Sequence, residues 1–270
     1  MKKFMVLILS VIALAVILSG CGGGGGGGNN GNNGNPPPAE VQSVLNDFTN
    51  NISNPDEAVN SLSLPFAFTD FNGKETLIPA GGESQAKQFL AGLDISGITI
   101  LNSQYKSTGT DTGEVTLTAR ATGDPGETSD YVFILNVKKV AEVWKIASLA
   151  PKSVSGTLIP DEIDEVLEKV GYIIDPNYSG DKPTMVTDCF DLPITANGTT
   201  LRTAAEVLAA LSELSDDGEI DTTNKRCQLT IGDKGTFSFT ISGDGETKFQ
   251  TNMVFVAGKW KFKNLTFQEI

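Results

Sequence analysis

Gly123–Leu149 reads GDPGETSDYVFILNVKKVAEVWKIASL, and Gly243–Leu265 reads GDGETKFQTNMVFVAGKWKFKNL. Both stretches start with a Gly-Asp turn, continue as an apolar run and end on Trp-Lys followed by another apolar residue. Polar glycine turns between apolar runs are typical of antiparallel strands. Each stretch therefore predicts a turn, a strand, a tight turn and a closing strand whose Trp points inward. The recurrence predicts that the chain contains one structural unit twice.

Each copy is also predicted to contain two amphipathic helices with apolar residues at i, i+3, i+4 and i+7. The first helix of each copy has a glutamate just ahead of its apolar face, at Glu40 and Glu162. Pro160 and Asp161 are typical of a helix start. The apolar positions are Val41, Val44, Leu45 and Phe48; Ile163, Val166, Leu167 and Val170; Ala86, Phe89, Leu90 and Leu93; and Ala204, Val207, Leu208 and Leu211.

Short elements are predicted between these helices. A helix is expected over residues 55–62, and its counterpart around residues 175–186 is expected to be short or irregular because prolines interrupt it. Asn-Gly at 72–73 and again at 197–198 lies between apolar stretches, which is a strong signal for a β-hairpin.

After the third helix the apolar pattern changes to a period of two. Val115, Leu117, Ala119 and Ala121 alternate with polar residues, and so do Phe237, Phe239 and Ile241. This alternation predicts half-buried antiparallel strands. Each half therefore reads helix, helix, hairpin, helix and four long strands. The sequence predicts an α+β protein with one unit over residues 39–155 and a second over residues 156–270.

This order of elements, ending in Trp144-Lys145-Ile146 and Trp260-Lys261-Phe262, resembles the NTF2-like (cystatin-like, SnoaL-type) family. The resemblance implies two tandem cone domains, each with about three helices packed on a curved antiparallel sheet. It also implies that each cone can hold a pocket. Because the family includes enzymes, binding proteins and interaction domains, the resemblance does not fix a function.

Composition excludes several classes of function. The 270 residues carry a net charge of −13, which disfavours binding to nucleic-acid phosphates. There is no histidine, so the commonest general base and the usual zinc ligand are missing. The acidic cluster from Asp216 to Asp221 lacks EF-hand spacing and is better explained as a solvated turn. No metal site and no cofactor are predicted.

The N-terminus indicates export and lipidation. Lys2 and Lys3 precede an apolar run that ends in Leu18-Ser19-Gly20-Cys21, and this end resembles the lipobox of bacterial lipoproteins. By this resemblance residues 1–20 are a signal peptide and Cys21 carries the acyl chains. Residues 21–38, rich in Gly, Asn and Pro, are then a flexible tether. The expected location is the cell envelope, at the outer membrane if the host is Gram-negative.

Two cysteines remain besides Cys21. Cys189 and Cys227 both lie in the second copy, and outside the cytoplasm two thiols in one domain favour a disulfide. The alternative is two buried free thiols. A catalytic cysteine is disfavoured because no histidine could activate it.

Seven residues are candidates for lining a pocket: Trp144, Trp260, Phe237, Phe239, Phe255, Asp130 and Tyr131. The aromatic residues could line an apolar cavity, although core packing is the favoured explanation for them. NTF2-like enzymes often use a pocket carboxylate with a Tyr donor, which the resemblance extends to Asp130 and Tyr131. Both are equally explained as residues at a solvated strand start.

These observations favour a lipid-anchored, non-catalytic module for binding a ligand or a protein. The expected partners are the membrane, through the anchor, and an envelope protein or small apolar ligand. A structural or assembly role through sheet pairing is one alternative. The other is a carboxylate-based enzyme acting on a small apolar substrate inside a cone.

Overall fold

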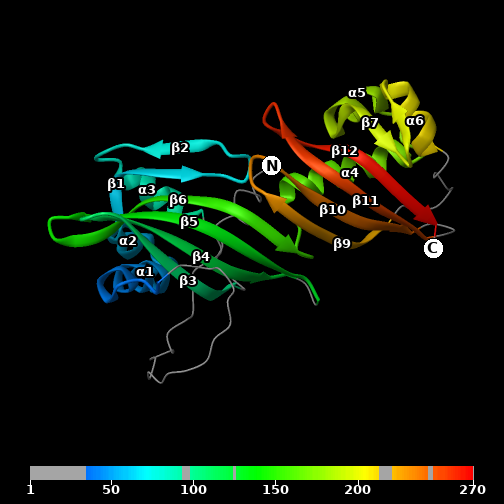
Figure 1. Cartoon of the computed structure of the whole chain (residues 1–270). Helices are drawn as coiled ribbons and strands as arrows, with labels where there is room; N and C mark the ends of the chain where they lie inside the picture. The colour runs from blue at the N-terminus through cyan, green and yellow to red at the C-terminus, as the bar shows by residue number, and fades with distance from the viewer. Residues whose placement is uncertain (1–34, 93–97, 124–125, 213–220, 243–245, 270) are drawn as a thin grey trace, which may run out of the picture. The chain divides into compact units, whose positions relative to one another are not determined.

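The computed structural model describes residues 35–92, 98–123, 126–212, 221–242 and 246–269. These residues form six α-helices, one short 3-10 helix and twelve strands, so the protein has the α+β class that the sequence predicts (Figure 1). Within these ranges, no helix combines the length and the hydropathy that crossing a membrane would require. The predicted signal peptide, Cys21 and most of the tether lie outside the described residues.

The chain folds into two compact units. The first contains the described residues up to Thr69, together with Glu75–Ala121 and Tyr131–Pro151. The second contains Asp70–Lys74, Thr122–Asp130 and the chain from Lys152 onward.

The first unit pairs its strands in the order β2-β1-β6-β5-β4-β3. Strands β1 and β6 run parallel, whereas β1–β2 and β3–β4 are antiparallel. The elements are α1 (Ala39–Asn51), α2 (Pro55–Ala58), η1 (Val59–Ser61), β1 (Leu62–Thr69), β2 (Glu75–Ile78), α3 (Glu83–Ala91), β3 (Ile98–Gly109), β4 (Thr112–Thr122), β5 (Thr128–Val140) and β6 (Val143–Gly156).

The second unit has the corresponding order β8-β7-β12-β11-β10-β9, and again its first hairpin strand, β7, runs parallel to its last strand, β12. The end of β6, Ser153–Gly156, belongs to this unit and pairs antiparallel with β9. The elements are α4 (Asp161–Ile174), α5 (Lys182–Cys189), β7 (Phe190–Ala196), β8 (Thr199–Leu201), α6 (Ala204–Ser212), β9 (Asp221–Thr230), β10 (Lys234–Ser242), β11 (Glu246–Val256) and β12 (Lys259–Glu269).

Local sequence explains the short elements. The β1–β2 turn is held by Asp70, whose Oδ1 accepts hydrogen bonds from the backbone N–H groups of Asn72 and Lys74, both at 2.9 Å. Helix α5 starts later than predicted, because Asp181 caps it by accepting from Thr184 N at 3.2 Å and Pro183 fits its first turn. Both predicted hairpins are confirmed.

The predicted apolar faces of the first helices form the cores. All four predicted positions on α1 and all four on α4 are buried, as are the inward residues of β4 and β10. On α3, Ala86 and Leu90 are buried, whereas Phe89 is half-buried and packs its ring 4.9 Å from that of Phe68. The fourth predicted position there, Leu93, lies outside the described residues. On α6, Val207 and Leu211 are buried, whereas Ala204 and Leu208 are half-buried. The period-two pattern therefore identified the buried strand faces, and the period-3.6 pattern identified those of α1 and α4 fully and those of α3 and α6 in part.

Candidate functional site

The first unit has a groove between α1, α2 and the turn that joins β5 to β6. We call it the α1 groove. Its volume is about 700 Å³, within the range of small-molecule sites. Trp144, at the start of β6, lies at its base with 8% of its surface exposed.

Two side-chain contacts fix the base of the α1 groove. The Trp144 indole Nε1 donates to Glu40 Oε2 at 3.3 Å, which joins the last strand to the first turn of α1. Lys145 Nζ donates to the backbone oxygen of Asn60 in η1. The walls are therefore held by bonds between elements that are far apart in sequence.

The α1 groove is acidic. Four carboxylates line it, and the one basic side chain among its lining residues is Lys145. Of the carboxylates, Glu142 pairs with Lys139 at 3.4 Å. No ion pair within the described ranges holds the other three, which are all exposed: Glu40, Asp47 and Glu57. Their uncompensated charge makes the groove attractive to a cation.

The second unit has a corresponding but narrower groove between α4, α5 and the β11–β12 turn. This α4 groove has a volume of about 130 Å³ and contains Trp260 and Glu162, the counterparts of Trp144 and Glu40. Lys259 and Asp188 both line it and form an ion pair of 3.0 Å. This pair links the turn to α5, and it also holds the pKa of Asp188 below its ordinary value.

Burial perturbs two carboxyls at the start of α4. It raises the pKa of Glu162 to about 7, and the charge of neighbouring Asp161 adds to the effect. It also raises the pKa of Asp161 to about 6, with a further contribution from Asp164. The Oδ2 atom of Asp161 is buried and has no hydrogen-bond partner in the described part of the chain. Desolvation disfavours the charged form, which explains both shifts.

The phenylalanine candidates lie in packed surroundings. Phe237 and Phe239 are each 1% exposed, and their rings join those of Phe249 and Phe262, with Phe239 and Phe249 stacked at 4.9 Å. Phe255 is half-buried and packs edge-on against Trp260 at 5.5 Å. These aromatic side chains fill the space where the sequence predicted an apolar cavity in the second unit.

Asp130 and Tyr131 lie at the start of β5, as expected. The Tyr131 ring is 3% exposed and stacks on Phe133 at 6.2 Å, whereas Asp130 is half-buried. Neither residue lines the α1 or the α4 groove. The structure therefore places this pair away from both grooves.

The predicted disulfide is wrong in this structure, where Cys189 and Cys227 are free buried thiols. Cys227 pairs with Phe237 across β9 and β10, whereas Cys189 directly precedes β7, which pairs with β12. Strands β9 and β7 are four spacings apart in the sheet, roughly 19 Å, while a disulfide needs its two α-carbons within about 7 Å. Burial raises the pKa of both thiols to about 12, so they are unreactive.

Sequence reasoning missed the carboxylates of the α1 groove. A signal was present, since Glu40, Ser43 and Asp47 follow the polar edge of α1 at helical spacing and Glu40 recurs as Glu162. The acidic cluster at 216–221 lies almost wholly outside the described residues. Among the residues that the structure describes, no three His, Cys, Asp or Glu side chains are grouped to hold a metal.

Comparison with solved structures gives similarities to NTF2-like proteins, each at low identity. One is a provisionally assigned ketosteroid isomerase from Shewanella frigidimarina, 21% identical over 42% of this chain and 94% of that chain, with a TM-score of 0.35. Another is an NTF2-like protein of unknown function from Shewanella oneidensis, 15% identical over 42% and 95%, with a TM-score of 0.33.

A third is a protein of unknown function with a cystatin-like fold from Nostoc punctiforme, 14% identical over 42% of this chain and 86% of that chain, with a TM-score of 0.32. No protein-family model matches the sequence, and no curated protein matches it. These likenesses concern the fold alone.

Proposed function

We propose that this protein is a lipid-anchored binding module of the cell envelope, made of two tandem NTF2-like domains. In this proposal the α1 groove of the first unit is the ligand site. The ligand is a small molecule with a protonated amine, rather than the apolar molecule expected from the sequence. The single observation that carries the proposal is an open groove of about 700 Å³ with three carboxylates outside any described ion pair around a fixed tryptophan.

The chemistry of the groove supports an amine. Ammonium groups donate strong hydrogen bonds to carboxylates, and a partly shielded groove strengthens the attraction relative to open water. Exposed Val143, at 54%, and the edge of Trp144 offer apolar contact for the carbon chain of such a ligand. The groove therefore suits a linear amine with a short aliphatic stem.

An enzymatic role has weaker support. A carboxyl with a pKa near 7, such as that of Glu162, is suited to proton transfer at neutral pH. However, the α4 groove that contains it, at about 130 Å³, is smaller than typical ligand sites.

Spermidine is a suitable probe for the binding site. Calorimetric titration of the full-length chain in detergent should show binding that is lowered about tenfold by the double variant Glu40→Gln, Asp47→Asn. The double variant Glu165→Gln, Glu168→Gln, which removes two exposed carboxylates from α4, is the charge-matched control and should leave the affinity unchanged. An equal loss of spermidine affinity in the groove variant and in the control variant would indicate attraction to the net negative charge alone. That result would contradict the proposal.

The anchor requires its own test. Expressed in a bacterium that processes lipoproteins, the native chain should fractionate with membranes and Cys21→Ser should not. A Cys21→Ser protein that remains with the membranes would remove the lipid anchor from the proposal without affecting the groove.

A further inference from the structure

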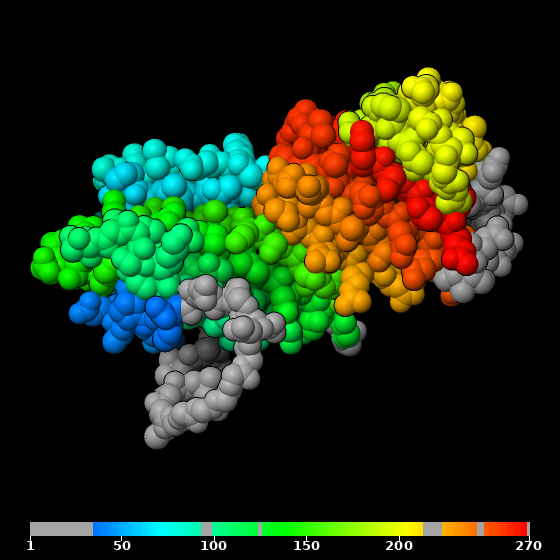
Figure 2. All heavy atoms as spheres, in the orientation of Figure 1, coloured from blue at the N-terminus to red at the C-terminus, as the bar shows by residue number. Residues whose placement is uncertain are grey.

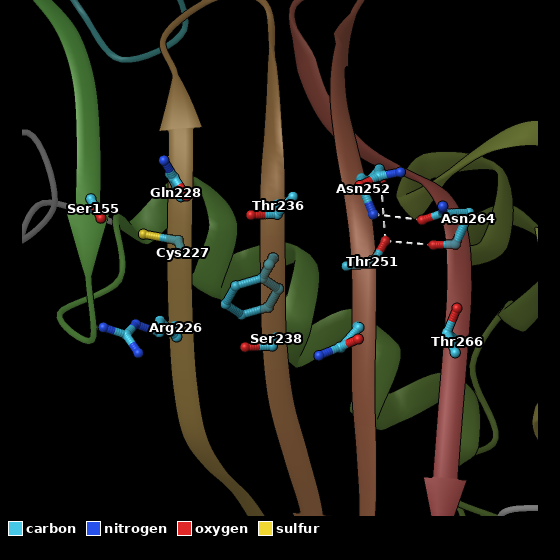
Figure 3. Close-up of a pocket in the computed structure, with 12 residues that line it drawn as sticks. Ser155, Arg226, Cys227, Gln228, Thr236, Ser238, Thr251, Asn252, Asn264 and Thr266 are labelled. Atoms are coloured by element: carbon cyan, nitrogen blue, oxygen red, sulfur yellow. Dashed lines mark hydrogen bonds between the residues drawn. The ribbon is translucent and has the colours of Figure 1, made fainter.

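A second cavity lies on the sheet of the second unit, on the face opposite α4 (Figure 3). This sheet hollow has a volume of about 510 Å³ and is formed by β9, β10, β11 and β12 with Ser155 at the end of β6. In the space-filling view, atoms of these strands, orange to red, form the surface with no helix over them (Figure 2). Side chains alternate between the two faces of a strand, so Thr236 and Ser238 on β10 face the hollow, whereas the buried side chains of Phe237 and Cys227 face the core.

A β-bulge shapes the hollow. The register of β11 and β12 shifts between Gln250 and Met253. At the shift, Asn252 N donates to Asn264 Oδ1 at 2.6 Å, and Thr251 Oγ1 donates to the Asn264 backbone oxygen at 2.5 Å (Figure 3). Bulges bend a strand and redirect its side chains. Asn264 therefore links the two strands at the shift and also lines the hollow.

The charge of the hollow differs from that of the chain. Although the protein has a net charge of −13, no carboxylate lines the hollow, and Arg226 is its one charged side chain. Arg226 is exposed, and no carboxylate in the described ranges pairs with it. The remaining lining side chains are mainly amides and hydroxyls, among them Gln228, Thr236, Ser238, Gln250, Asn264 and Thr266.

We infer that the sheet hollow binds a sugar acid, a ligand with one carboxylate and several hydroxyls. The guanidinium of Arg226 matches the two oxygens of a carboxylate with two parallel hydrogen bonds. The amides and hydroxyls can each donate to or accept from sugar hydroxyls. A single cation fits a singly charged carboxylate better than a phosphate dianion, and the absence of carboxylates from the lining avoids repulsion. This site is independent of the α1 groove.

The test is calorimetric titration of the full-length chain in detergent with glucuronate, with glucose as the uncharged analogue. Glucuronate should bind at least about tenfold more tightly than glucose, and Arg226→Gln should remove that preference. Lys248→Gln is the matched control, because Lys248 lies on β11 outside the lining and its change removes the same charge. Both variants should keep the native circular-dichroism spectrum.

Two further arms separate the sources of the ligand. A uronic-acid oligomer that binds more tightly than glucuronate identifies a polysaccharide chain as the ligand, and equal affinity identifies the free sugar acid. The inference would be overturned if glucose and glucuronate bound equally well or if neither bound. It would also be overturned if Arg226→Gln and Lys248→Gln lowered the affinity for glucuronate equally. Dimerisation that buries this face, measured by sedimentation and unaffected by glucuronate, would overturn it as well.

Discussion

The two units share one order of elements but differ in what they expose. Beside its tryptophan, the first unit has a groove of about 700 Å³ and the second one of about 130 Å³. Two residues that line the second groove, Lys259 and Asp188, form an ion pair. On the sheet, the first unit has half-buried Val132 and Ile134 where the second has exposed Lys248 and Gln250. A repeated core thus carries different surfaces, which is the pattern expected if each unit binds a different partner.

The largest expected effect is a loss of stability, and it tests whether the core of the second unit depends on an aromatic residue where the first unit has a small one. Phe239 corresponds to Ala119 when the strands are aligned on the turns that follow them. Phe239→Ala should lower the free energy of unfolding by about 3–5 kcal/mol, because it leaves a cavity beside Phe249 and Phe262. Urea denaturation measures this, and half-buried Phe255→Ala should cost only about 1–2 kcal/mol. A tolerated Phe239→Ala would contradict the packed-core description.

The next effect concerns the bond that fixes the first groove. Trp144→Phe removes the indole N–H that donates to Glu40 and should cost about 1–2 kcal/mol of stability. A double-mutant cycle with Glu40→Ala, which removes the acceptor, should give a coupling energy of about 0.5–1.5 kcal/mol. A coupling of zero would show that the 3.3 Å contact does not stabilise the protein in solution.

A pH effect is expected from the second unit. Folding raises the pKa of Glu162 from 4.5 to about 7, so between these values the folded state holds a proton that the unfolded state releases. Stability should therefore fall as the pH rises from about 5 to about 7.5, and Glu162→Gln should raise the melting temperature at about pH 8 by a few degrees.

Several charged groups surround Glu162: Asp161, Glu165, Asp70, Lys169, Asp188 and Lys259. Asp161 has a raised pKa of about 6, so the stability of the Glu162→Gln protein should still fall with rising pH, but less steeply than in the native protein. If stability depended on pH equally in the Glu162→Gln protein and in the native protein, Glu162 would already be ionised in the folded state at a pH below its raised pKa.

The smallest effect on stability is expected from Lys259→Ala. The ion pair with Asp188 is partly exposed, with 57% and 38% of the two side chains accessible, so its loss should cost less than about 1 kcal/mol. The change should open the second groove, which can be followed by the fluorescence of Trp260 and its quenching by acrylamide. Unaltered quenching would show that the pair does not close the groove.

Sequence predicted the elements better than the site. The spacing of Val41, Val44, Leu45 and Phe48 identified a buried helix face, because burial imposes a period that a single sequence reveals. The α1 groove depends on which elements meet, and Glu40 lies 104 residues from Trp144. The hollow depends on a bulge in β12, where β12 has one residue more than β11, and no sequence pattern in β12 predicts it. Pairings between distant segments, such as the strand order that separates Cys189 from Cys227, were likewise not predictable.

The central claim is that the two grooves have diverged, and that the first one binds an amine. The chain has two tryptophans, one in each groove, so an NMR spectrum of the nitrogen-15 labelled protein has one indole N–H signal for each. The Trp144→Phe and Trp260→Phe variants assign the two signals. On titration with spermidine, the Trp144 signal should shift and saturate while the Trp260 signal stays in place. Equal shifts of both signals, or no shift of the Trp144 signal at saturating spermidine, would contradict the claim.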